Sequence, residues 1–312
     1  MRSLERHESP HPSGAGFCCP YCSAALVPRG VGLLCESEGR FFAASDGVYR
    51  LLEEKRRTEL RPLIELEHRL RRDQGFTAIP GLPEVPRSHP QAALWRKRSR
   101  NLREGLRLTG QVLGEGPWRV LEVGAGCAWA GAVLAAAGHR VTAVDASLDP
   151  EDGLLAVDRV LAPGLRLERA EADMEALPLE AGSHDLVLAV DALHHAREIV
   201  RTLVELRRVT RRGGCLLVLE SPVYVRRADG EADVARRMRR LRRRYRLDLP
   251  RDVQPGYLVR SELQSLFETA GYRLESGVLA SGFAARLLEV GAALLGRGGL
   301  PARPVLFARR DG

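Results

Sequence analysis

The chain has 312 residues, of which 45% are hydrophobic, enough for one large domain and a smaller one. No apolar run approaches the roughly 20 residues that a membrane helix needs, and the polar first residues lack the apolar stretch of a signal peptide, so we expect a cytoplasmic protein with no membrane partner. The formal net charge is +8, but most of the excess lies in 226–246, which holds ten arginines and three acidic residues, so the total charge does not by itself indicate nucleic-acid binding.

Four of the six cysteines lie close together near the N-terminus. Cys19 and Cys22 are separated by two residues, Cys18 precedes them and Cys35 follows. Clustered cysteines in a cytoplasmic protein indicate a metal before they indicate disulfides, and a structural zinc needs four ligands. Cys19, Cys22 and Cys35 are therefore candidate zinc ligands, with Cys18 or Glu38 as the fourth. The alternative is a module that has lost its metal and is held together by its apolar core.

Changes in composition divide the chain into three parts. Residues 17–52 are rich in turns and short apolar stretches, which predicts a small β-rich module. The charged segment that follows predicts a helix interrupted or restarted at Pro62, and four prolines between residues 80 and 90 predict an irregular connection. We therefore expect a helical and proline-rich linker over 53–89 and a larger domain over 90–312.

Strand-like and helix-like segments alternate in the larger domain. A helix is expected from Pro90 to about Leu108, and short apolar runs after it predict buried strands separated by segments with helical spacing of apolar residues. The expected strands are 119–123, 140–145, 165–173, 184–191 and 215–220, followed by 272–280 and 303–310 on either side of an apolar helix at 283–296. This order predicts an α/β fold with a doubly wound, mostly parallel, seven-stranded Rossmann-like sheet.

The most informative motif is VLEVGAGCAWA at 120–130, directly after the first expected strand of this sheet. Gly124 and Gly126 stand at a turn where a side chain would block both the backbone and an approaching ligand. A dinucleotide-binding loop would have a small residue where Trp129 stands. The motif therefore favours a nucleotide-like ligand and disfavours a nicotinamide oxidoreductase.

An acidic strand residue followed by this glycine pattern resembles the first motif of class I S-adenosylmethionine-dependent methyltransferases. In that family the strand acid, here Glu122, commonly helps to hold the ammonium group of the cofactor. Asp145 stands where the family's acid accepts hydrogen bonds from the ribose hydroxyls, and Asp173 stands where an acid lies near the adenine amino group. Ala128 departs from the family's frequent third glycine. The resemblance implies S-adenosylmethionine as cofactor, held by Glu122, Gly124, Ala125, Gly126, Asp145, Ala146, Asp173, Met174 and Val190.

Candidate catalytic residues follow the fourth expected strand of the sheet. Methyl transfer is an in-line displacement in which the cofactor supplies the electrophile, so the protein positions, desolvates and sometimes deprotonates the acceptor. His194, His195 and Asp191 are candidate bases. The alternative is that a histidine caps the next helix or lines the cofactor pocket without taking a proton. Tyr224 and Tyr257 lie where the family builds its substrate cap, and the alternative for each is packing.

Two further segments bear on the acceptor. The N-terminal module is similar to the zinc-ribbon modules that precede bacterial rRNA guanine methyltransferases, which implies a zinc-ribbon-like module before the sheet. The segment at about 231–247 predicts an Arg-rich cap helix with one apolar stripe, either a solvated surface helix or a lid that recognises RNA or an acidic metabolite. The fourth strand lacks the N/D-P-P-Y/F motif of many nucleic-acid amine methyltransferases.

The sequence thus predicts an enzyme that transfers a methyl group from S-adenosylmethionine to a small molecule or RNA. The alternative is a non-catalytic RNA- or protein-binding module that retains the cofactor as a structural ligand.

Overall fold

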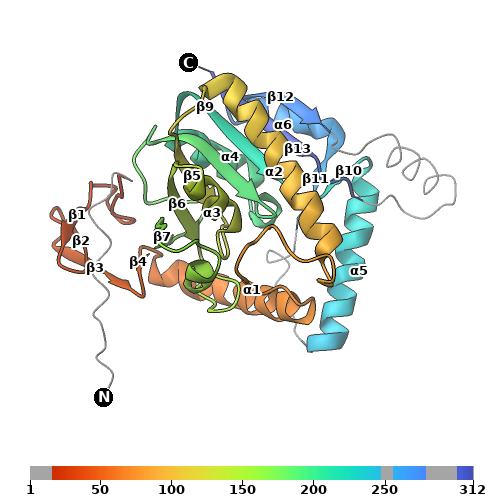
Figure 1. Ribbon diagram of the computed structural model, residues 1–312, viewed down its shortest axis with the longest axis horizontal. Coiled ribbons are helices and arrows are strands. Elements are labelled where there is room, and N and C mark those ends of the chain that lie inside the picture. Colours follow the sequence, from red (N-terminus) through yellow and green to blue (C-terminus); the bar gives the residue numbers. More distant parts are fainter. Residues whose placement is uncertain (1–15, 247–255, 279–300, 312) are drawn as a thin grey trace, which may run out of the picture.

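One mixed sheet forms the centre of the computed structural model, which describes residues 16–246, 256–278 and 301–311 (Figure 1). Its strands are β1 (Val27–Arg29), β2 (Gly32–Cys35), β3 (Arg40–Ser45), β4 (Val48–Arg50), β5 (Arg119–Val123), β6 (Arg140–Asp145), β7 (Glu168–Glu171), β8 (His184–Val190), β9 (Thr210–Leu219), β12 (Tyr272–Val278) and β13 (Val305–Arg310). Their order across the sheet is β1-β2-β3-β4-β7-β6-β5-β8-β9-β13-β12. The helix expected at 283–296 lies outside the described residues.

The middle of the sheet is parallel and its two ends are antiparallel. Strands β4, β7, β6, β5, β8 and β9 pair in parallel, whereas β13 and β12 pair antiparallel beyond β9. The seven strands expected for the larger domain are present from β7 to β12. The N-terminal module extends this sheet, because β4 pairs with β7 and brings Tyr49 opposite Ala170.

Six α-helices accompany the sheet in the described part of the chain. They are α1 (Glu54–Asp73), α2 (Ala92–Leu113), α3 (Trp129–Ala136), α4 (Ile199–Val209), α5 (Arg227–Tyr245) and α6 (Leu263–Thr269). A separate pair of short parallel strands, β10 (Val223–Tyr224) and β11 (Leu258–Val259), lies beside α5. The Arg-rich cap helix is α5. It begins at Arg227, four residues earlier than the sequence predicts.

Alternate residues of the central strands pack into two different cores. On β8, Val187 and Ala189 join a cluster with Leu203 of α4 and Phe267 of α6. Leu186, Leu188 and Val190 join a second cluster, which holds Trp95 of α2 and Trp129 of α3. This alternation is the period-two pattern of a strand, and it places helices on both faces of the sheet as the sequence predicts.

Helix α1 differs from its prediction in two ways. It continues through Pro62, which is exposed. Proline lacks an N–H, so the helix loses one backbone hydrogen bond there but does not end. It also packs as an element of the domain: Leu66 is buried against Val234, Met238 and Leu241, the apolar stripe that the sequence predicts on α5. The segment expected to be a linker thus contributes a helix that packs against α5.

Candidate cofactor and acceptor site

A cavity of about 880 Å³ lies between α1 and the carboxyl ends of strands β5 to β8. Parallel strands bring their carboxyl ends to one edge of a sheet, where ligands of such folds usually bind. Six residues expected to bind the cofactor line this cavity: Gly124, Gly126, Asp145, Ala146, Asp173 and Met174. Segments far apart in the sequence therefore meet as the methyltransferase motif implies.

The loop after β5 takes three left-handed backbone conformations within five residues. Gly124 and Gly126 have φ angles of 59° and 54°, and Ala128 has 50°. A Cβ on Gly124 would lie 2.5 Å from the Cβ of Ala192, so this close approach excludes a side chain there. Ala128 occupies a conformation that favours glycine, which explains why a third glycine is frequent at this position.

Asp145 holds the glycine loop in place while it faces the cavity. One of its carboxylate oxygens accepts a hydrogen bond from the backbone N–H of Gly126 at 2.7 Å, and the other accepts one from the N–H of Ser147 at 2.7 Å. Each oxygen retains a further acceptor site. At the next strand, Asp173 accepts a 2.5 Å hydrogen bond from Arg56, which ties the start of α1 to this end of the cavity.

Glu122 does not reach the cavity, in contrast to its expected role. Its side chain is 1% exposed and accepts a 2.7 Å hydrogen bond from the backbone N–H of Gly131 in α3. Burial raises the pKa of this carboxyl to about 8. Ala125 and Val190 also stand outside the main cavity and border a smaller one of about 30 Å³ beside it.

The three candidate bases occupy different environments. Burial alone would raise the pKa of Asp191, but Arg98 at 2.6 Å, His194 and Arg303 at 2.8 Å hold it below its usual range, so the carboxylate is a poor proton acceptor. His194 is buried away from the main cavity, and burial lowers the pKa of its imidazole well below the ordinary value. His195 lines the cavity, with its Nδ1 4.0 Å from the Glu67 carboxylate of α1.

The two tyrosines expected in the substrate cap also separate. Tyr257 lines the cavity, whereas Tyr224 is buried outside it and contacts the Tyr257 ring edge-on at 5.7 Å. Tyr224 therefore supports the cap by packing.

Sequence reasoning missed the contribution of α1 to this cavity. One wall consists of half-buried and buried apolar side chains from α1, α4, β11 and α6: Leu60, Leu63, Ile64, Ile199, Leu258, Val259 and Leu266. The spacing of Leu60, Leu63 and Ile64 marks an apolar face of α1, so the signal was present. Glu67, His68 and Arg71 lie on the same helix and also line the cavity.

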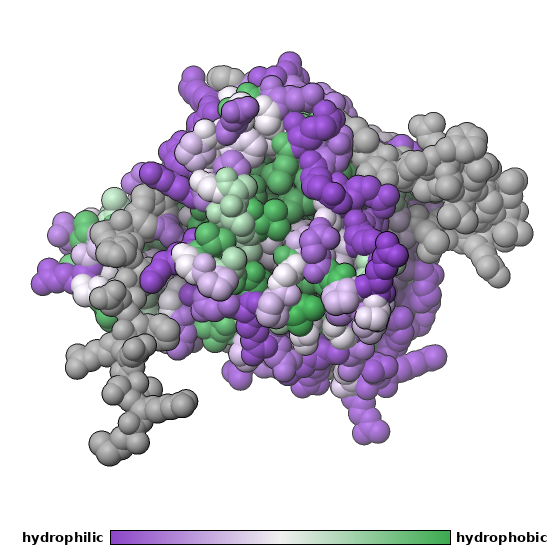
Figure 2. Space-filling model, viewed as in Figure 1, coloured by the Kyte–Doolittle hydropathy of each residue, from purple (hydrophilic) through white to green (hydrophobic). Residues whose placement is uncertain are grey.

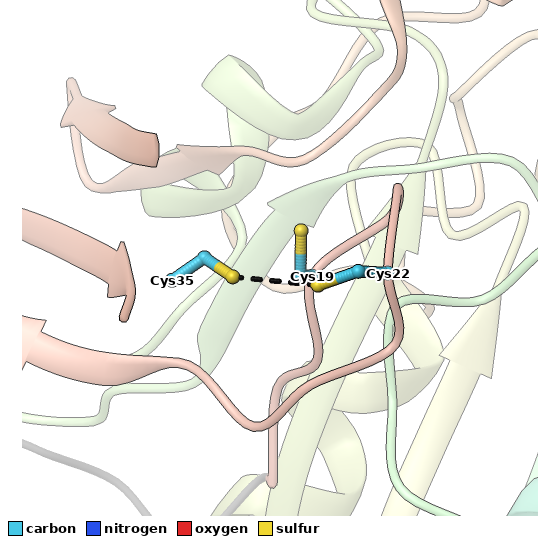
Figure 3. Close-up of side chains that lie close together, drawn as sticks. All are labelled: Cys19, Cys22 and Cys35. Carbon is cyan, nitrogen blue, oxygen red and sulfur yellow. Dashed lines mark hydrogen bonds between the residues drawn. The ribbon is translucent and has the colours of Figure 1, made fainter. Parts of the chain in front are cut away.

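The cysteine cluster lies in the N-terminal module (Figure 3), and none of its three cysteines lines this cavity. The sulfurs of Cys19, Cys22 and Cys35 lie within 4.8 Å of one another, and those of Cys22 and Cys35 are 3.5 Å apart. Glu38 brings a carboxylate oxygen to 3.8 Å from the Cys19 sulfur. The Cys18 sulfur instead lies 3.9 Å from the Gly16 carbonyl oxygen. Three thiols and a carboxylate fit a tetrahedral zinc.

Comparison with known proteins agrees with this geometry. Residues 121–218 match a family model described as a methyltransferase domain. An uncharacterised protein of Mycobacterium tuberculosis is 45% identical over 101 residues, covering 32% of this chain and 36% of that protein. A demethylmenaquinone methyltransferase of Clavibacter sepedonicus is 36% identical over 115 residues, covering 36% of this chain and 44% of the relative. The chain thus matches less than half the length of these curated relatives.

A solved structure shares the fold over most of both chains. It is a putative sarcosine dimethylglycine methyltransferase from Galdieria sulphuraria, with a TM-score of 0.53 and 15% identity over 79% of this chain and 98% of that one. None of the helices in the described residues is long and apolar enough to cross a membrane. Residues 121–218 therefore match a methyltransferase domain, and the sheet that contains them has the fold of that solved structure.

Proposed function

We propose that the chain transfers a methyl group from S-adenosylmethionine to a small, neutral and largely apolar acceptor. The observation that carries this proposal is one cavity lined both by the glycine loop with strand-end carboxylates and by apolar side chains of α1, α4, β11 and α6. S-adenosylmethionine, when bound, supplies the methyl electrophile. Its nucleoside would lie between Asp145, which meets the ribose hydroxyls, and Asp173 with Met174, which meet the adenine.

The acceptor side of the cavity favours an uncharged ligand. The charged groups at its margin are paired with one another: Arg197 lies 3.6 Å from Glu59, and Arg227 lies 2.6 Å from Glu262. These pairs are about half exposed and individually weak, but a charged acceptor would have to compete with them for a partner. An apolar ring or chain would instead bury the surfaces of Leu63 and Leu266.

His195 is the proton acceptor that fits this site best. Glu67 lies 4.0 Å from its Nδ1, which is too far for a hydrogen bond, and the ring lines the cavity, so an imidazole nitrogen can take the acceptor's proton as the carbon–sulfur bond breaks. The other two candidates are less suitable. Asp191 is engaged by two arginines, and His194 stands outside the cavity.

Labelled S-adenosylmethionine and a bacterial cell extract test the proposal. After incubation with the protein, the mixture is separated into RNA, protein, water-soluble and organic-soluble fractions. We expect label in the organic-soluble fraction, and none when His195→Gln replaces the unmodified chain although it still binds S-adenosylhomocysteine. Label confined to RNA or protein would contradict a small apolar acceptor.

RNA remains the second candidate because α5 carries exposed arginines. Arg239, Arg240 and Arg243 are exposed on α5, and Figure 2 shows hydrophilic residues over the region of this helix. Other arginines of this helix are already paired: Arg236 and Arg237 with Asp233, and Arg244 with Asp73. This pairing favours a solvated surface helix, and label in the RNA fraction is the result that would favour RNA.

We also propose that residues 17–52 form a zinc-ribbon-like module with Cys19, Cys22, Cys35 and Glu38 as ligands. The metal would hold the turn at Cys19 to the end of β2 and so steady the strands that extend the sheet. Metal analysis of protein purified without added zinc should give one zinc per chain. Cys35→Ser should lose that zinc and Cys18→Ser should retain it. A zinc content near zero in the folded, unmodified chain would contradict the proposal.

A further inference from the structure

We infer that Arg71 and Asp152 form the subsite for the amino-acid end of S-adenosylmethionine, with Arg71 taking its carboxylate and Asp152 its ammonium group. This inference rests on the proposed function. The cofactor ends in a zwitterion, so burying that end requires a partner of each sign.

The small cavity beside the main one lies where this end of the cofactor would extend. The two cavities share Arg71, Gly124, Asp152 and Asp191, so they meet directly above the glycine loop. A nucleoside placed at Asp145 and Asp173 would direct its amino-acid end across Gly124 into this space.

Two other carboxylates near the loop are unsuitable for the ammonium group. Glu122 lies beneath the loop, is bonded to Gly131 and does not line either cavity. Asp191 does line both, but the two guanidinium groups of Arg98 and Arg303 already balance its negative charge. The ammonium group therefore needs a different carboxylate, and Asp152 supplies it.

Asp152 is buried and has an acceptor oxygen to spare. The residue is 7% exposed, and its Oδ2 has no hydrogen-bond partner among the described residues. A buried carboxylate oxygen without a donor is rare in folded proteins and indicates a missing partner. Burial also raises the pKa of this carboxyl to about 6, despite the nearby positive charge of Arg71.

Arg71 provides the opposite charge beside it. Its Nε lies 3.7 Å from Asp152 Oδ2, which is close enough for attraction and too long for a hydrogen bond. The guanidinium makes no side-chain hydrogen bond within the described part of the chain, and one of its terminal nitrogens lies 3.7 Å from the place of a Cβ on Gly126. Both groups are therefore free to bond a ligand that lies on the loop.

His68, Asp149 and Asp152 also lie within 4.8 Å of one another, an arrangement that could hold a cation. The positive charge of Arg71 at 3.7 Å disfavours a metal ion at Asp152. An organic ammonium group, paired with a carboxylate that neutralises Arg71, fits the same charges without this repulsion.

Two ligands that differ only at the amino-acid end test the subsite. Calorimetry compares S-adenosylhomocysteine with 5′-methylthioadenosine, which keeps the nucleoside and sulfur but lacks the zwitterion. We expect Arg71→Met and Asp152→Asn each to weaken S-adenosylhomocysteine by about 10- to 100-fold, the usual effect of losing a charged hydrogen bond. Binding of 5′-methylthioadenosine should change less than about twofold, which also shows that each variant is folded.

Arg72→Met is the matched control, because Arg72 is the exposed neighbour of Arg71 on the same helix. It should bind both ligands as the unmodified chain does. Unchanged binding of S-adenosylhomocysteine in Arg71→Met and Asp152→Asn, or equal loss of both ligands, would overturn the subsite while leaving the proposed function intact. Failure of the unmodified chain to bind either ligand would refute the proposed function and the subsite with it.

Discussion

Replacing Glu122 with glutamine should stabilise the protein at neutral pH and leave cofactor binding unchanged. Glutamine has the same shape and keeps an oxygen that accepts the hydrogen bond from Gly131, but it cannot ionise. Glu122 is buried, and its pKa rises from 4.5 to about 8 on folding. At pH 7 the carboxyl is therefore ionised in the unfolded chain and protonated in the folded one, so folding must take up a proton.

The size of this effect follows from the two pKa values. Between pH 4.5 and pH 7 the proton uptake costs about 1.4 kcal/mol per pH unit, which sets an upper limit of about 3 kcal/mol at pH 7. Because the folded-state pKa is raised, the contribution of Glu122 to stability is most favourable below pH 4.5 and falls as pH rises toward 8. Glu122→Gln removes this loss, so its advantage should be less than about 1 kcal/mol at pH 5 and largest near pH 8.

Urea unfolding at pH 5, 7 and 8 measures the difference, and calorimetry with S-adenosylhomocysteine measures binding. Glu115→Gln is the control, because Glu115 is exposed and its replacement should change stability little at any of these pH values. A Glu122→Gln chain that is less stable than the unmodified one at pH 8 would refute the reasoning. A tenfold loss of S-adenosylhomocysteine affinity would return Glu122 to the ammonium-binding role that the family resemblance implies.

Three further predictions concern packing, catalysis and the cysteine cluster. Gly105→Ala should destabilise the protein by about 1–3 kcal/mol in urea unfolding, because a Cβ there would lie 2.5 Å from Leu217, where α2 meets β9. As the control, Gly110→Ala adds a Cβ with no atom near it and should stabilise the protein by about 0.5–1 kcal/mol. A stable Gly105→Ala would show that α2 packs elsewhere. Once an acceptor is known, His195→Gln should lower kcat by about 100-fold or more, while His194→Gln should retain more activity. Equal losses of kcat would contradict the assignment of His195 as the base because it lines the cavity and His194 does not. If zinc is bound, a chelator should lower the unfolding temperature of the unmodified chain but not that of Cys35→Ser, and an identical response of both would place the metal elsewhere.

The sequence could predict that residues at the ends of strands would line one cavity. Asp145 and Asp173 each end or follow a parallel strand, and such ends meet at one edge because the strands run in the same direction. Glu122 lies within β5, and Val190, although it ends β8, follows the strand alternation that points side chains to the faces of the sheet. Glu122 therefore lies under α3 and Val190 in the core beside it.

The remaining parts depend on contacts that local patterns do not specify. The apolar spacing on α1 shows that one face will be buried, but not that Leu63 will face the glycine loop from across a cavity. Likewise, the short apolar run at β4 does not specify its parallel pairing with β7, more than one hundred residues later. Burial of Asp191 between Arg98 and Arg303 joins three distant segments, and this changes a candidate base into a paired anion.

A crystal structure of the protein with S-adenosylhomocysteine tests the central claim most directly. We predict that the ligand lies across Gly124 and Gly126, with its ribose at Asp145, its adenine near Asp173 and its sulfur facing the apolar wall that includes Leu63. A saturating concentration of S-adenosylhomocysteine that leaves this cavity empty, or a ligand bound elsewhere on the chain, would contradict the account.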